Sequence, residues 1–122
     1  MSTIAERVAA GAAFLDEHDP GWWRADVERA IDLPRLNLVS EYSCMLGQRC
    51  PLEVLAAHEG KDEDGEAEGP FWAYALVLAS LEGDDDVLTW ATRYGFADIP
   101  ALRYPELTAE WTRLIEARRS QP

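Results

Sequence analysis

The sequence predicts an all-α fold: a single-domain, compact bundle of five to seven short helices. Three observations predict it. Apolar residues recur at helical spacing in several segments, no segment alternates as a half-buried strand would, and 122 residues suit one domain. The stretch 71–81 is apolar nearly all round and contains three alanines. We expect it to be the apolar central helix, surrounded by amphipathic ones.

The first helix is predicted from a capping box. The Thr3 hydroxyl can accept a hydrogen bond from the Glu6 amide while the Glu6 carboxylate reaches back, and apolar spacing then continues to about Glu17. Gly11 lies on the apolar face, which indicates the close approach of another helix. A proline after an aspartate then predicts a second, short helix over 21–31.

The middle of the chain predicts short elements. Residues 33–38 read as a turn or 3₁₀ connector that places its leucines inward, with an extended conformation as the alternative. Ser40 can cap a short helix that Gly47 ends, and Pro51 can start another. Residues 59–70 break all periodicity and form an acidic flexible loop within the domain.

The C-terminal third predicts two further helices. The acidic run 84–86 ends the apolar helix and caps the next one. Gly95 then stands where a left-handed residue follows a helix, with Phe96 placed for the accompanying apolar contact. The last helix begins near Pro105 or Thr108.

The negative charge is concentrated at the two ends of segment 71–81. The net charge is −12, and residues 59–70 hold six acids against one lysine while residues 82–86 hold four acids. Such a field disfavours direct binding of nucleic acid or an anionic membrane and attracts a basic protein surface. The candidate partner-binding residues are eight of these acids and a pair of tryptophans: Asp62, Glu63, Asp64, Glu66, Glu68, Asp84, Asp85, Asp86, Trp22 and Trp23.

The same acidic loop has a plainer interpretation as a solvated connector that keeps an aromatic-rich protein in solution. It does not match a calcium loop. Registers starting at Asp62 or Asp64 both place an alanine where the twelfth-position glutamate is needed.

No catalytic motif, cofactor or metal site is predicted. Cys44 and Cys50 with His18 and His58 match no usual zinc spacing, and two reduced thiols acting as small apolar side chains are expected instead. A pairing of Cys44 with His58 as a small hydrolase stays open as an alternative. Phosphate-loop, metalloprotease and serine-hydrolase motifs are not found in the sequence.

Several short motifs resemble those of small uncharacterised proteins from actinobacteria and their phages. The motifs are "LDE" with "PGW" at 15–22, "IDLPRLNL" at 31–38, "CMLGQ" at 44–48 and "YGF" at 94–96. The resemblance covers about two-thirds of the chain. This sequence departs from the family's pattern in the acidic loop. The resemblance implies a phage- or prophage-associated protein and carries no known activity, so it transfers no catalytic residue.

Together these features predict a non-enzymatic, cytoplasmic accessory protein that binds a protein partner through an acidic and aromatic surface. We expect neither an export signal nor a membrane span. Three alternatives stay open: a DNA mimic that inhibits a nucleic-acid-binding protein, a homo-oligomeric structural component, and the small Cys/His hydrolase.

Overall fold

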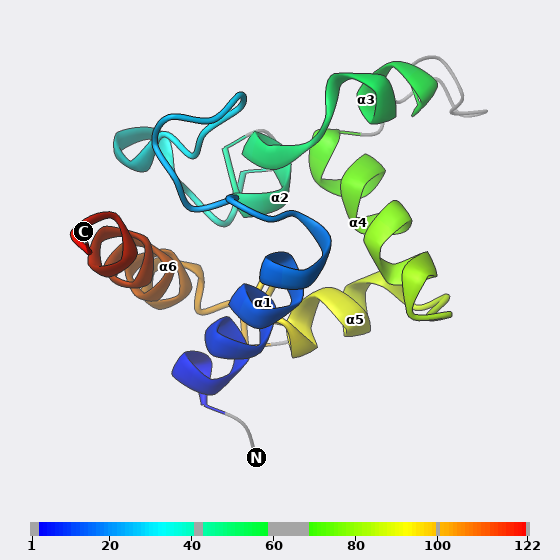
Figure 1. Ribbon diagram of the computed structural model, residues 1–122. Helices are drawn as coiled ribbons and strands as arrows, with labels where there is room; N and C mark the ends of the chain where they lie inside the picture. The colour runs from blue at the N-terminus through cyan, green and yellow to red at the C-terminus, as the bar shows by residue number, and fades with distance from the viewer. Residues whose placement is uncertain (1–2, 41–42, 59–68, 100, 122) are drawn as a thin grey trace.

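The computed structural model describes residues 3–40, 43–58, 69–99 and 101–121, and within them the fold is an all-α bundle without strands (Figure 1). This confirms the predicted fold class. The elements are α1 (Ile4–His18), the 3₁₀ turn η1 (Leu33–Arg35), α2 (Met45–Arg49), α3 (Leu52–His58), α4 (Pro70–Leu81), α5 (Val87–Arg93) and α6 (Tyr104–Arg119).

Helix α1 begins at the predicted capping box. The Thr3 hydroxyl accepts from the Glu6 amide at 3.1 Å, and the Glu6 carboxylate accepts from the Thr3 amide at 3.2 Å. The helix packs against α5 and α6, and Gly11 lies at the crossing. A Cβ atom at Gly11 would overlap the carbonyl oxygen of Tyr94 and lie 3.0 Å from the Trp111 ring. The predicted close approach is confirmed.

Three buried tryptophans form the centre of the core, each with its indole N–H satisfied. Trp22 Nε1 donates to the Asp16 carboxylate and Trp90 Nε1 to the Glu82 carboxylate, both at 2.9 Å. Trp111 Nε1 donates to a backbone carbonyl. Burying an indole without a partner for this donor would be costly, so these bonds fix how the rings are oriented.

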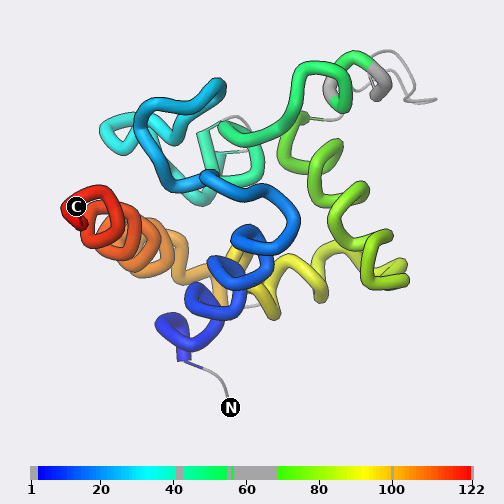
Figure 2. Tube along the Cα trace, viewed as in Figure 1, coloured from blue at the N-terminus to red at the C-terminus, as the bar shows by residue number. Residues whose placement is uncertain are grey.

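The helix predicted over 21–31 is not formed, and that prediction is wrong. Residues 20–32 form turns, bends and irregular segments, seen in Figure 2 as a loop that follows α1. Gly21 and Arg29 both adopt positive φ angles, of 80° and 58°, which no α-helix allows. The Arg49 guanidinium also holds this loop, because its Nη1 donates to the carbonyls of Glu28 and Arg29 at 2.9 Å each.

The connector after this loop is confirmed as a 3₁₀ turn, η1, with Leu36 and Leu38 buried. Helix α2 begins later and runs further than predicted. Its N-cap is Cys44, whose sulfur accepts from the Gly47 amide, and Gly47 lies inside the helix instead of ending it. Helix α3 follows Pro51 as expected.

The apolar segment forms helix α4, which contacts α2, α3 and α5. Its packing is one-sided. Figure 1 shows α4 at the right-hand edge of the molecule, and its outward positions Trp72, Leu76 and Ser80 all keep solvent-exposed area. These three lie four residues apart, so they share one face of the helix. The predicted helix is therefore present, with an outer face that no described helix covers.

The last two helices follow the predicted signals. Asp86 is the N-cap of α5, and Gly95 has a φ of 75° directly after that helix. The Phe96 amide donates to the carbonyl of Ala91 at 2.9 Å, and Phe96 stacks on Trp111. Helix α6 begins at Tyr104, slightly before the predicted start, and buries Leu107, Trp111 and Ile115.

Candidate binding surface

The acidic residues split into two groups by what the structure describes. Asp62, Glu63, Asp64, Glu66 and Glu68 lie outside the described residues. The other group, Asp84, Asp85 and Asp86, follows the C-terminal end of α4. Since Pro70 begins α4, the undescribed acids precede the opposite end of the same helix in the sequence.

Two of the three described aspartates are used within the chain. The Asp86 carboxylate accepts from the amide and hydroxyl of Thr89, which lowers the pKa of Asp86. Asp84 accepts from the Asp86 amide at 3.0 Å and forms an ion pair with Arg93 at 3.4 Å. Asp85 is exposed and has no hydrogen bond or ion pair to another described residue. It is the carboxylate of this cluster that a partner could contact at the lowest cost.

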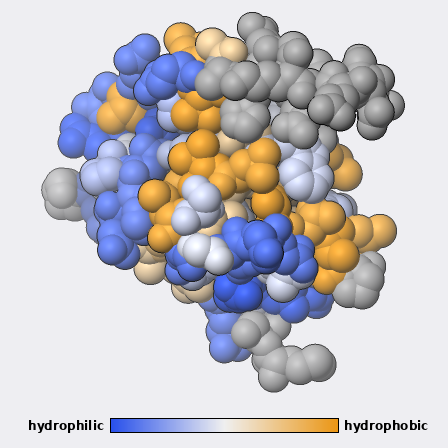
Figure 3. Space-filling view, turned by 90° about the vertical axis from the view of Figure 1, so that its right-hand side faces the viewer, coloured by the Kyte–Doolittle hydropathy of each residue, from blue (hydrophilic) through white to orange (hydrophobic). Residues whose placement is uncertain are grey.

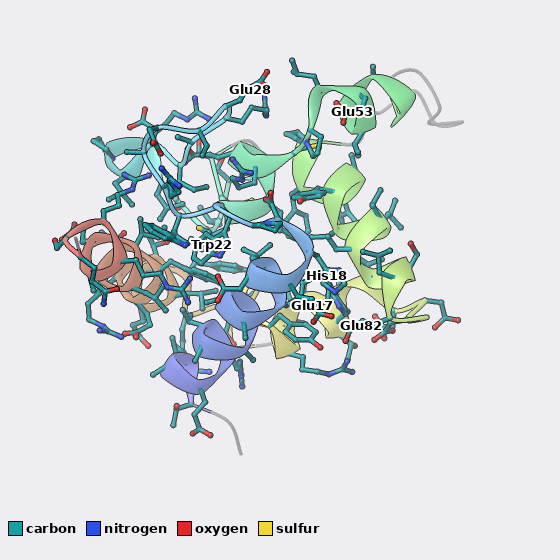
Figure 4. The ribbon with its side chains drawn as sticks, in the orientation of Figure 1. Glu17, His18, Trp22, Glu28, Glu53 and Glu82 are labelled. Carbon is teal, nitrogen blue, oxygen red and sulfur yellow. The ribbon has the colours of Figure 1, made fainter. Side chains whose placement is uncertain are left out.

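The two candidate tryptophans have different surroundings. Trp22 has no exposed area; it lies between α1 and α6, edge-on to Trp111 (Figure 4). Trp22 is therefore not a partner-binding residue, contrary to the prediction from the sequence, because a side chain without accessible surface cannot contact a docked protein. Trp23 is half-buried, and its backbone carbonyl accepts from Arg119 at 2.8 Å.

Both cysteines are buried, as predicted for thiols that act as small apolar side chains. Burial raises the pKa of the Cys50 thiol, while the nearby Arg29 charge acts in the opposite direction. The side chain of His58, the proposed base of the hydrolase alternative, is not among those described. No three His, Cys, Asp or Glu side chains of the described segments are grouped as a metal site would require. Within those segments, no helix is both long and apolar enough to span a bilayer.

A set of exposed apolar side chains on the described surface was not predicted from the sequence. Leu76 and Leu81 on α4 and Leu88 on α5 are 37%, 58% and 38% exposed. Figure 3 views the molecule from the side on which α4 lies, and hydrophobic residues gather over the middle and right of that face. Isolated exposed leucines are ordinary on protein surfaces, but contiguous patches mark interaction sites.

Two adjoining hollows extend this apolar area. The smaller, about 160 Å³, is lined by residues that include Trp72, Leu88, Val39 and Tyr104. The larger, about 620 Å³, is lined by Asn37, Val39, Leu102, Tyr104, Pro105 and Thr108. Val39 and Tyr104 belong to both linings, so the hollows share a wall. We call the whole area the apolar surface; it comprises Trp72, Leu76, Leu88, Val39, Leu102 and Tyr104.

Leu102 is held in a conformation that leucine rarely adopts. Its φ is 58°, in the left-handed region, and its side chain is 57% exposed. The buried Asp98 fixes this turn: its carbonyl accepts from the Leu102 amide at 2.7 Å. Its carboxylate accepts from the amide and guanidinium of Arg103 and from the guanidinium of Arg7. These hydrogen bonds keep the pKa of Asp98 below its usual value, with that from Arg103 contributing most.

Helix periodicity could not reveal this surface, because its residues come from α4, α5, α6 and two loops. The one local signal is the apolar run Ile99 to Leu102, which stands between the segments of α5 and α6 in the sequence. Comparisons with protein families, with characterised proteins and with solved structures find no match to this chain.

Proposed function

We propose that this chain is a non-enzymatic binding protein that docks a segment of another protein on the apolar surface. The segment carries apolar side chains flanked by basic ones. The observation that carries the proposal is the pair of adjoining hollows, whose linings include the exposed side chains of Val39, Leu88 and Leu102. Such a concave apolar area accommodates the anchor residues on which protein–protein affinity depends.

The strain at Leu102 supports this proposal. A leucine in the left-handed region costs about 1 kcal/mol or more, and its side chain, being exposed, gains little from burial in return. Asn or Gly at this position would avoid the cost. A contact made by the leucine side chain with a docked segment would account for its presence there.

The charge distribution favours a basic partner. The acids at residues 82–86 follow α4, those at 59–68 precede it, and the chain as a whole carries −12. A partner with Lys or Arg beside its apolar residues would be attracted to this area. A second copy of the same chain would be repelled by the same charge, so self-association is the less favoured way to cover the surface. We do not propose DNA mimicry, because Asp84 and Asp86 already accept hydrogen bonds within the chain.

The experiment is a selection of helical peptides from a random display library against the whole protein, with a Leu88→Glu variant as counter-selection. We expect enriched peptides to combine apolar residues with Lys or Arg and to bind about tenfold or more weakly to the Leu88→Glu protein. Leu52→Glu is the matched control, since Leu52 is an exposed leucine outside the apolar surface. It should bind like the wild type.

Three results would contradict the proposal. Enriched peptides that contain no excess of Lys or Arg would show that the partner is not selected by its positive charge. Equal weakening by Leu52→Glu would show that the effect is not local. Concentration-dependent dimerisation in sedimentation, lost in the Leu88→Glu variant, would assign the surface to a second copy of the chain. The phage association implied by the resemblance stays a prediction.

A further inference from the structure

A third pocket shares no lining residue with the two hollows of the apolar surface and has a different chemistry. It has a volume of about 290 Å³ and is lined by the loop after α1 and by the α2–α3 junction. Its described lining residues are Asp19, Glu28, Arg29, Arg49, Pro51, Leu52 and Glu53. Sites for drug-sized molecules span roughly 300–1,000 Å³, so this pocket suits a ligand no larger than a small metabolite.

One wall of the pocket is already paired and rigid. Arg49 donates from Nε and Nη2 to the two carboxylate oxygens of Asp19, at 2.9 and 2.6 Å. Its Nη1 donates to the carbonyls of Glu28 and Arg29. Both side chains of this ion pair are largely buried. Arg49 and Asp19 therefore neutralise each other and hold the loop in place, and neither needs a ligand.

Arg29, in contrast, has a charge that the described chain does not pair. Its Nε is shielded from solvent and has no hydrogen-bond partner, and its side chain forms no ion pair with another described residue. Its backbone is also in the left-handed region, with a φ of 58°. A shielded guanidinium donor without an acceptor is rare in native proteins, and a carboxylate is the group that best matches its planar donor geometry.

The opposite charge is supplied by Glu28 and Glu53. Figure 4 shows the two glutamates on neighbouring segments at the same end of the molecule. Both are exposed and neither forms an ion pair with another described residue, so their carboxylates can accept from a ligand. Pro51 and the exposed Leu52 add apolar area to the lining. The pocket thus offers one cation, two anions and an apolar wall.

We propose that this pocket binds a small zwitterion, a free amino acid or a molecule of that type. Its carboxylate pairs with the Arg29 guanidinium, its ammonium group lies between Glu28 and Glu53, and its side chain contacts Leu52. A simple anion such as phosphate fits less well, because the two glutamates repel it. A simple amine fits less well because it leaves Arg29 unpaired.

The test is a thermal-shift screen of the whole protein against the twenty standard amino acids at millimolar concentration, followed by calorimetry of the best one. We expect saturable binding that weakens by about tenfold or more when that amino acid is N-acetylated or amidated, because each change removes one charge. Inorganic phosphate is the probe for a simple anion. If no amino acid raises the melting temperature, or if phosphate or a singly charged form binds equally tightly, the proposal is wrong.

Variants locate the site and separate binding from folding. Arg29→Asn removes the guanidinium while keeping a residue that tolerates the left-handed region, so the variant should fold and lose binding. Glu28→Gln combined with Glu53→Gln should weaken binding of the zwitterion but not of its N-acetyl form. Arg24→Gln is the matched control, as Arg24 lies in the same loop, exposed and paired with Asp26. Binding that persists in folded Arg29→Asn would overturn the assignment.

Discussion

Replacing Asp98 by Asn tests how the turn that presents Leu102 is held. Asp98 is the one charged residue among the fully buried side chains of the described core. Its carboxylate accepts from Arg7 Nη1 at 3.0 Å and from the Arg103 amide and Nε at 2.8 Å each. Asn keeps the shape of the side chain, removes the charge and turns one acceptor into a donor that faces a guanidinium.

The expected loss follows from these contacts. Breaking a fully buried ion pair costs about 3–5 kcal/mol, because the remaining charge is left without a partner. Here the side chains of Arg7 and Arg103 are 21% and 40% exposed, so water can solvate them partly in the variant. We therefore expect the lower end, a destabilisation of about 3 kcal/mol, equivalent to a fall of roughly 10 °C in melting temperature for a chain of this length.

The assay is urea unfolding followed by tryptophan fluorescence, at several pH values. The pKa of Asp98 is lower in the folded than in the unfolded chain, so its contribution is complete above the usual value of 3.8 and is lost as the pH falls through the folded pKa. The difference in unfolding free energy between wild type and Asp98→Asn should be constant near neutrality. It should shrink below about pH 4, where protonated Asp98 resembles Asn.

A matched control is Asp26→Asn, which breaks an exposed ion pair with Arg24 and should leave stability unchanged. The reasoning is refuted if Asp98→Asn unfolds at the same urea concentration as the wild type. A difference that stays constant down to pH 2 would also refute it, since the loss would then not come from the charge.

Two further predictions concern the core. Gly11→Ala gains about 1 kcal/mol in helix propensity but forces a Cβ against the Tyr94 carbonyl. We therefore expect urea unfolding to show a net loss of about 2 kcal/mol in the free energy of unfolding. An increase in stability would show that the helices separate easily. Cys44 and Cys50 are buried, and burial raises the pKa of the Cys50 thiol. A thiol reagent at pH 8 should therefore label the native protein about a hundredfold more slowly than the protein unfolded in urea. Equal labelling rates would contradict the packing of these two side chains.

Local signals in the sequence were enough for most helices. The capping box, the apolar composition of 71–81 and the glycine after α5 each act within a few residues, and α1, α4 and α5 lie where these signals place them. The sequence could not predict that α4 packs on one side only. Its composition is apolar on every face, so no periodicity distinguishes the covered side from the open one.

Long-range contacts of the loop over 20–32 explain why the helix predicted over 21–31 does not form. The local pattern of this loop favours a helix, but Trp22 is inserted beside Trp111 of α6, and Arg49, about twenty residues later, binds the carbonyls of Glu28 and Arg29. These contacts are distant in sequence and outweigh helix propensity, which is worth less than about 1 kcal/mol per residue. The same holds for the apolar surface and for the Arg29 pocket, which bring together residues from several elements.

The most direct test of the proposed docking surface is a Leu102→Asn variant, measured for stability and for binding of a peptide selected against the wild type. Asn tolerates the left-handed region and removes the exposed apolar side chain, so stability should be unchanged or higher while the peptide binds about tenfold or more weakly. Peptide binding as tight as that of the wild type, in a folded Leu102→Asn protein, would contradict the account.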